Sequence, residues 1–524
     1  MEAMMNQWLT VPTFKNLNQN SAIRQFCPAR VEQEQVGEWG EELLEEELEI
    51  WPHYVNETPQ LAPSEVEEIV DTFFNVECYQ KDNTDKFQEE GPQDFSLIDD
   101  VYYGSTDPMI IEGDELEGCS PSDDLVLLGN HVENVITIGV DQGLHLVHLL
   151  LACAEAVGCR DTKLADSILT QIWPCVSPWG DSLQRVSHCF AMGLKSRLSL
   201  LQNVNPNGSF SSRGNDVSLI TREEKVEAFT LLHQTTPYIA FGFLAANDAI
   251  FQAASGKEFL HIIDLGMEHI LQWTSFVRSL ACRTEITLKT LRITGIIGDQ
   301  DRLELERSAN GLCEEANALE FSLEFHFLAE QVSPLSLTRE KLNLRDEEAL
   351  FVNSIMHLHK HVKESRGSLK TILQSIKKFN PSLVTVVEQD ANHNGPFFLG
   401  RFLESLHYYS AIFDSLEASL PRNSPERIMI EKFHFAEEIC NVVACEGSNR
   451  IERHERADQW RRQLGRCGFQ VVGSKCLNEA RMMVSGYGSD GYTVVCEKGC
   501  LHLGWKGRPI MLASAWQVHN MSPP

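Results

Sequence analysis

The residues best placed to do chemistry follow an apolar run near the middle of the chain, Leu260-His261-Ile262-Ile263-Asp264, with Gly266 two residues later. Such a run predicts a buried parallel strand that delivers its last residues to the edge where open α/β folds bind ligands. In nucleotide-dependent enzymes the next turn is rich in glycine, because backbone N–H groups must approach a phosphate closely. Here Met267 to Leu271 contains no further glycine. The pattern therefore indicates an enzyme-like scaffold with an altered cofactor turn.

A methyltransferase that uses S-adenosylmethionine is one functional hypothesis for this scaffold. It needs the glycine-rich turn and an acid at the end of the second strand, which holds the ribose hydroxyls. The acid after the second predicted strand, Asp299, comes several positions late. We therefore expect no catalysis and no cofactor. We interpret Asp264 as a structural carboxylate that accepts hydrogen bonds from the backbone or from Trp273.

Two groups of residues have the side-chain types that bind zinc. They are Cys496, Cys500 and His502, and the alternating His357, His359 and His361. The first group lacks a fourth ligand at a matching spacing, and the second lies at a predicted strand end or helix start. Core thiols and solvated histidines are the simpler interpretation, so the sequence predicts no metal site.

The densest basic run extends from Arg450 to Arg466 and is the best candidate for contacts with DNA. Acidic residues interleave with it at the i,i+3 and i,i+4 spacing of a helix, for example Glu452 and Glu455. This pattern predicts an exposed helix with internal salt bridges. Direct DNA binding remains an alternative, and it would show a steep dependence on salt concentration.

The elements that position these residues alternate between strand and helix. The predicted strands are Thr290 to Ile297, Leu350 to Ile355, Leu383 to Glu388 and Arg427 to Phe433, and the predicted helices include Asp301 to Leu319 and Gly395 to Leu420. Short apolar runs between Phe469 and Trp516 predict closing antiparallel strands. The expected fold is α/β, with a mostly parallel sheet and helices on both faces.

The amino-terminal quarter differs from the rest in charge. Residues 1–140 hold 31 acidic and 5 basic residues, so they carry a net charge of −26 out of −31 for the whole chain. We expect residues 1–139 to form an acidic, largely disordered regulatory arm. Alternating acidic and apolar residues fit either a transcriptional activation or docking segment, or a solvated linker.

A helical pattern begins near residue 140, and we expect residues 140–255 to form a mainly helical cap on an α/β core of residues 256–524. Leu146, Leu149 and Leu150 spell the leucine pattern by which many coregulators dock, which makes them candidates for partner binding. The same spacing also describes the buried stripe of an ordinary helix.

The chain lacks the features of a secreted or membrane protein. Its 15 cysteines follow no ordered framework, which favours free thiols in a reducing compartment. The first residues lack the basic and apolar regions of a signal peptide, and no apolar run reaches the length of a membrane span. We therefore expect a soluble intracellular protein.

Five motifs in order resemble the GRAS family of plant transcriptional regulators over residues 140–518. Leu260 to Asp264 with Gln272-Trp273 resembles the VHIID motif, and helices from Leu144 and Asp301 match the flanking leucine-rich regions. Phe398 to Leu416 and Val442 to Glu455 resemble the PFYRE region. The terminal SAW motif is matched by Arg508-Pro509 and by Ser514-Ala515-Trp516.

The resemblance implies a Rossmann-like core similar to methyltransferases, a helical cap, residence in the nucleus, and association with other GRAS proteins or DNA-binding transcription factors. It is compatible with homo- or heterodimers and with indirect binding to promoter DNA. The arm lacks the Asp-Glu-Leu-Leu-Ala sequence of DELLA members, and the group named Required for Arbuscule Development is the subfamily expected. Glu437 replaces an arginine of the family pattern, so the salt bridge of that arginine is not expected here.

Overall fold

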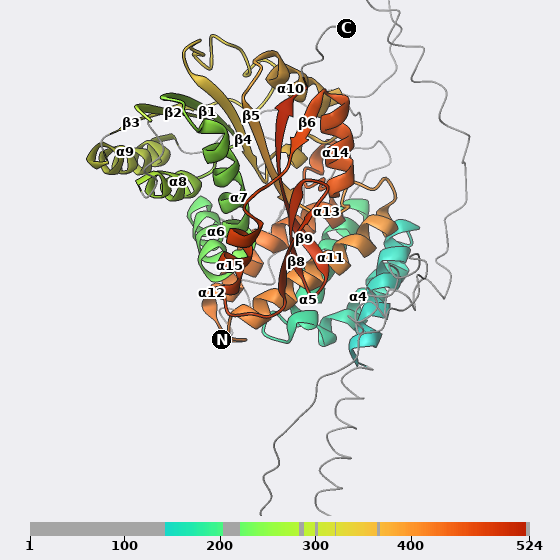
Figure 1. Ribbon diagram of the computed structural model, residues 1–524. Coiled ribbons are helices and arrows are strands. Elements are labelled where there is room, and N and C mark those ends of the chain that lie inside the picture. The colour runs from blue at the N-terminus through green and yellow to red at the C-terminus, as the bar shows by residue number, and fades with distance from the viewer. Residues whose placement is uncertain are drawn as a thin grey trace, which may run out of the picture.

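The computed structural model describes residues 142–202, 221–281, 288–298, 302–319, 321–363 and 367–519 (Figure 1). The acidic arm predicted over residues 1–139 lies outside the described residues, and so does Asp299. Both interpretations therefore stay predictions.

A nine-stranded mixed sheet forms the centre of the described chain. Its strands are β1 (Phe259–Leu265), β2 (Thr290–Ile296), β3 (Ser322–Leu328), β4 (Ala349–Ile355), β5 (Leu383–Gln389), β6 (Phe469–Val472), β7 (Tyr492–Glu497), β8 (Cys500–Trp505) and β9 (Arg508–Val518). The order is β3-β2-β1-β4-β5-β9-β8-β7, and β6 also pairs with β9. Strands β1 to β5 are parallel, whereas β9 is antiparallel to β5, β6 and β8. The predicted Rossmann-like, methyltransferase-like α/β class is confirmed, as are the closing antiparallel strands.

Strand β1 lies inside the parallel part of the sheet, between β2 and β4. Ile263 is paired in register with Thr294 of β2 and Val352 of β4. Successive side chains of a strand point to opposite faces, and Ile262 and Ile263 are both fully buried. Each such side chain contributes about 1.5–3 kcal/mol through burial. A continuous apolar run is therefore what a strand covered on both faces requires.

Helices cover both faces of this sheet. One face packs against α7 (Pro237–Ala254), α8 (Leu271–Ala281) and α9 (Arg302–Ala318), and the other packs against α10 (Gly367–Lys378) and α14 (Ala457–Arg466). Figure 1 shows α8 and α9 beside β2 and β3. The helices on both faces explain why β1 carries no alternating polar residues.

The helical cap is built from two separate stretches of the chain. The first stretch contributes a helix over residues 142–158, α4 (Thr162–Ile172), η3 (Trp173–Cys175), α5 (Ser182–Gln202) and α6 (Arg222–Thr235), and the second contributes α11 (Phe398–Ser419), α12 (Pro425–Ile430), the π-helix η5 (Glu431–Phe435) and α13 (Ala436–Ala444). Helix α5 packs on α11 through Phe190 and Phe402, whose rings lie 5.3 Å apart, edge to face. The expected cap range of 140–255 differs from this packing, because α7 lies on β5 and β9 while α11 and α13 pack on α5.

The strand predicted from Arg427 to Phe433 is wrong, because this stretch is helical. Ser424 caps α12 by accepting a hydrogen bond of 3.1 Å from the backbone N–H of Arg427, and Pro425 occupies the first turn. In the following π-helix the buried Glu431 accepts hydrogen bonds from Arg185 at 3.0 Å and Arg427 at 2.5 Å. Helix-start signals therefore override the local apolar run.

Strand β3 and helix α15 (Leu477–Ser485) were not predicted. The alternation that marks a strand is present in β3, since Leu323, Phe325 and Phe327 alternate with Glu324 and His326. The short helices η4 (Leu358–His361) and η6 (Gly447–Asn449) complete the described elements.

Candidate functional site

The carboxyl end of β1 is held by a buried hydrogen bond from α8. Oδ2 of Asp264 accepts a bond of 2.8 Å from Nε1 of Trp273, and Oδ1 accepts one of 3.1 Å from Nδ2 of Asn353. Burial raises the pKa of Asp264 to about 7, although both hydrogen bonds act in the opposite direction. Of the two donors expected for Asp264, the backbone and Trp273, the bond from Trp273 is confirmed.

Gln272 and Asn353 extend this polar cluster to two more elements, α7 and β5. Its Nε2 donates to Asn247 on α7 at 3.1 Å, and its Oε1 accepts 2.9 Å from Nδ2 of Asn353 on β4. Thr385 on β5 donates to Oδ1 of Asn353 at 2.7 Å. Buried amides of this kind are costly unless they are paired. The cluster therefore fixes the positions of α7 and α8 relative to the carboxyl ends of the strands, where α/β proteins bind ligands.

Side chains fill the space above the turn that follows β1. Gly266 adopts a φ of +71°, and a Cβ atom there would lie 1.9 Å from Nδ1 of His357. On the neighbouring strand, a Cβ at Gly295 would lie 2.6 Å from Sδ of Met267. The absence of a side chain at Gly266 thus makes room for the imidazole of His357. The buried side chain of Met267 occupies the corresponding space at Gly295.

The three alternating histidines point in two directions. Nε2 of His357 and Nε2 of His361 lie 3.0 Å apart. His359 faces the interior instead, where its Nδ1 lies 2.6 Å from Oε2 of Glu388 and its Nε2 lies 2.9 Å from Oε2 of Glu452. Burial alone would lower the pKa of His359, but the two carboxylates outweigh it and raise the pKa to about 10. The expectation of a solvated histidine is wrong for His359.

The amino-terminal half of the basic run is extended and buried, so the predicted exposed helix is wrong there. Arg450, Arg453 and His454 are each at most 3 % exposed, and α14 begins only at Ala457. Arg453 donates hydrogen bonds of 2.9 Å to the carbonyl oxygens of Arg450 and Gly447. These guanidinium groups are engaged inside the protein and do not face a phosphate backbone.

The end of β5 carries further polar contacts. Oδ2 of Asp390 lies 2.9 Å from Nδ1 of His502. The imidazole of His502 therefore pairs with Asp390 and not with Cys496 or Cys500. Cys500 is buried and Cys496 is exposed, so Cys496 is not the core thiol that was expected. Both are free thiols.

Glu437 and its neighbour Glu438 make separate contacts, Glu437 with the cap and Glu438 beside β5. Nε2 of Gln389 donates to Glu438 at 2.9 Å, and the hydroxyl of Tyr409 donates at 3.0 Å. Burial raises the pKa of Glu438. Glu437 itself pairs with Lys225 at 2.8 Å on the cap.

The terminal motif fastens β9 to its neighbours. Arg508 donates to Glu404 at 2.9 Å and also contacts His407, and Pro509 lies where the register with β8 shifts. Trp516 donates 3.0 Å to Ser514, whose hydroxyl donates 3.2 Å to the carbonyl of Val386. The remaining residue of the motif, Ala515, is buried opposite Thr385. These contacts give the motif a structural role.

The leucines proposed for docking lie on the first cap helix. Leu146 and Leu150 are buried at 3 % and 0 % exposure, and Leu149 is only partly buried. Docking through these side chains stays a prediction, and Leu149 is the one that a partner can reach most directly.

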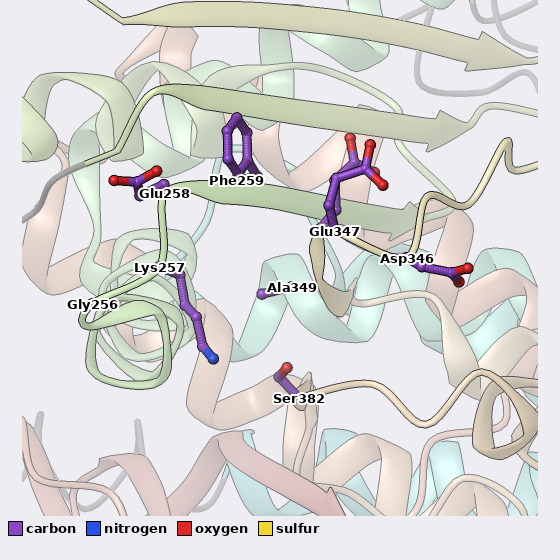
Figure 2. A pocket seen from close by; sticks show the side chains of 9 residues that line it. Gly256, Lys257, Glu258, Phe259, Asp346, Glu347, Ala349 and Ser382 are labelled. Atoms are coloured by element: carbon purple, nitrogen blue, oxygen red, sulfur yellow. The ribbon is translucent and has the colours of Figure 1, made fainter.

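A shallow pocket of about 360 Å³ lies at the other end of the strands, beside the amino ends of β1 and β4. Figure 2 shows Lys257 and Ser382 beside the acidic residues Glu258, Asp346 and Glu347. The excess of carboxylates gives no cradle for phosphate, and the pocket is remote from Asp264 along β1.

None of the helices in the described ranges combines the length and apolar character needed to cross a bilayer.

Residues 146–517 match the GRAS domain family. The chain is 45% identical over 386 residues to GRAS family protein RAD1 of Lotus japonicus, covering 72% of this chain and 75% of that protein. It is 37% identical over 394 residues to DELLA protein GAI1 of Vitis vinifera, covering 74% and 64% of the two chains. The crystal structure of SCL7 from Oryza sativa superposes with a TM-score of 0.62 at 28% identity, over 71% of this chain and 99% of that one.

Proposed function

Since this chain belongs to the GRAS family of plant transcriptional regulators, we propose that it works in the nucleus as a coregulator that binds other GRAS proteins or DNA-binding transcription factors and reaches promoter DNA through them. Its likeness to RAD1 proteins, which are non-DELLA members, supports a role in the signalling of arbuscular mycorrhizal symbiosis.

One observation carries the proposal: the edge of the sheet that would hold a cofactor is filled and hydrogen-bonded internally. His357 packs over Gly266, Met267 packs over Gly295, and Asp264 is engaged by Trp273 and Asn353. A methyltransferase would need these positions open toward its cofactor. The scaffold is therefore available to hold cap and core in one geometry that partners recognise.

Co-purification with other GRAS proteins and with DNA-binding factors tests the proposal, using the full chain. Leu149→Glu should weaken capture, because it places a charge on the partly buried side of the first cap helix. Leu335→Glu is the matched control, since Leu335 is 78 % exposed and lies between β3 and β4, away from the cap. Circular dichroism should show that both variants are folded. Capture that is unaffected by Leu149→Glu would exclude this helix face as the docking surface, and no capture at all would contradict the coregulator.

Direct DNA binding is the second candidate function, and the exposed arginines of α14 are what favours it. Arg462 and Arg466 are exposed at the carboxyl half of the basic run. If the full chain alone binds promoter fragments with a steep salt dependence, and if Arg462→Ala with Arg466→Ala removes that binding, the protein contacts DNA itself. Calorimetric titration with S-adenosylmethionine tests the enzyme alternative, and micromolar binding would overturn the coregulator proposal.

A further inference from the structure

A cluster of buried side chains of the types that bind metals lies between η4 and the extended segment before α14. Within the described ranges, His359, Glu452 and His454 bring one nitrogen or oxygen atom each to within 4.8 Å of one another. Nε2 of His359 lies 2.9 Å from Oε2 of Glu452, and Nε2 of His454 lies 3.3 Å from the same oxygen. All three residues are at most 8 % exposed. Two ligands of a tetrahedral zinc ion, each about 2.0–2.1 Å from the metal, lie about 3.3 Å apart, so this spacing fits the ion.

His359 is oriented as zinc-binding histidines are. Glu388 faces its Nδ1 at 2.6 Å and also accepts the backbone N–H of His359 at 3.2 Å. A carboxylate at Nδ1 makes that nitrogen the donor and turns Nε2 toward the metal, which is the arrangement found around metal-bound histidines. Without a cation or a proton, the Nε2 lone pair would face the Glu452 carboxylate.

His454 supplies the second, independent observation. Its Nδ1 lies 2.9 Å from Nδ1 of His393, and the backbone N–H of His393 donates 3.0 Å to the carbonyl of His454. Nε2 of His454 is fully buried and lies 3.3 Å from Oε2 of Glu452, with which it can pair only when the ring is protonated. A neutral ring that turns its Nε2 lone pair toward a buried carboxylate is costly, and a metal ion at this point would satisfy both groups.

We propose that His359, Glu452 and His454 bind one zinc ion, which ties η4 to the extended segment before α14 and, through Glu388, to β5. When zinc binds, His359 releases its Nε2 proton to solvent and both histidines are neutral ligands. The dication then balances the two buried carboxylates, Glu388 and Glu452. Three protein ligands leave the fourth tetrahedral position of the ion to a water molecule.

The test uses the full chain, measured after gel filtration without added metal and again after chelation and return of zinc. We expect one zinc per chain, X-ray absorption showing nitrogen and oxygen ligands with two imidazoles, and a higher Tm when zinc is restored. Adventitious zinc on exposed thiols such as Cys159 and Cys496 would show sulfur ligands instead. Sulfur ligands, or no zinc held against a micromolar chelator, would overturn the proposal.

Variants assign the ligands. His454→Asn should abolish stoichiometric zinc, and Glu388→Gln should weaken zinc binding by about 10–100-fold, because it removes the carboxylate behind His359. The matched control is His357→Asn with His361→Asn, which removes the other close histidine pair and should keep the metal. Retention by His454→Asn, or loss in the control, would overturn the assignment. If His454→Asn does not fold, the ligand set seen by X-ray absorption in the unmodified protein decides.

Discussion

Nε1 of Trp273 donates a hydrogen bond of 2.8 Å to Oδ2 of Asp264, joining the first turns of α8 to the carboxyl end of β1. Trp273 is fully buried and Asp264 is 6 % exposed. Since the acceptor is a carboxylate in a low-dielectric interior, this bond is among the stronger kinds in a protein.

Trp273→Phe should lower the free energy of unfolding by about 1.5–3 kcal/mol more than Trp460→Phe does. Both indoles are fully buried, but Nε1 of Trp460 has no hydrogen-bond partner among the described residues. Each change removes a similar volume, and only the first takes one of two donors away from a buried carboxylate. Urea unfolding of the two variants measures the difference. Equal losses would show that the indole of Trp273 contributes through packing alone.

Stability should depend on pH through Asp264. Its pKa is about 7 in the folded protein against an ordinary value of 3.8, so between these values the folded chain holds a proton that the unfolded chain releases. The free energy of unfolding must then fall as pH rises through this window. Relative to Asp264→Asn, the unmodified protein should lose up to about 1.4 kcal/mol per pH unit between pH 5 and 7. Parallel profiles of the two proteins would contradict the raised pKa.

Gly266→Ala should destabilise the protein more than Gly256→Ala. Both glycines have positive φ, +71° and +74°, so each substitution costs about 1–2 kcal/mol in backbone strain. Only at Gly266 does the new Cβ meet a side chain, His357, whereas nothing lies within 4 Å at Gly256. Overpacking adds about 1–3 kcal/mol. Thermal and urea unfolding measure both, and His357→Ala in the Gly266→Ala background should recover part of the loss.

Glu431→Gln should cost about 3–5 kcal/mol, because it leaves two buried guanidinium groups, Arg185 and Arg427, without the carboxylate they share. Glu315→Gln is the control, since Glu315 forms a similar pair with Arg278 on the surface and its loss should leave stability unchanged. Urea unfolding is again the measurement. If Glu431→Gln is as mild as the control, then the π-helix of the cap is held by packing and not by this ion pair.

Local patterns in the sequence were sufficient for four of the five parallel strands. Strands β1, β2, β4 and β5 are apolar runs bounded by turn residues, and such runs need cover on both faces, which implies the helical layers. The same local reasoning failed at Arg427 to Phe433, where a short apolar run is compatible with strand or helix until the capping residues are weighed.

Side-chain partners distant in the chain could not be read in this way. His359 meets Glu452, 93 residues later, and Arg185 meets Glu431, 246 residues later. The charges of Arg450 to Glu455 have helical spacing, yet the segment is extended, because Oδ1 of Asn441 accepts its backbone N–H groups at Ile451 and Glu452.

The sequence by itself determined the α/β class, the central strand that carries Asp264, Trp273 as one of two candidate donors to that carboxylate, and the family resemblance, because these depend on periodicity and on residues close together in the chain. Only the tertiary structure decided that His357 fills the turn at Gly266, that the arginines before α14 are buried, and that two histidines converge on Glu452. The physical reason is that desolvation and ion pairing depend on which groups the fold brings within a few ångströms of each other, whatever their separation along the chain.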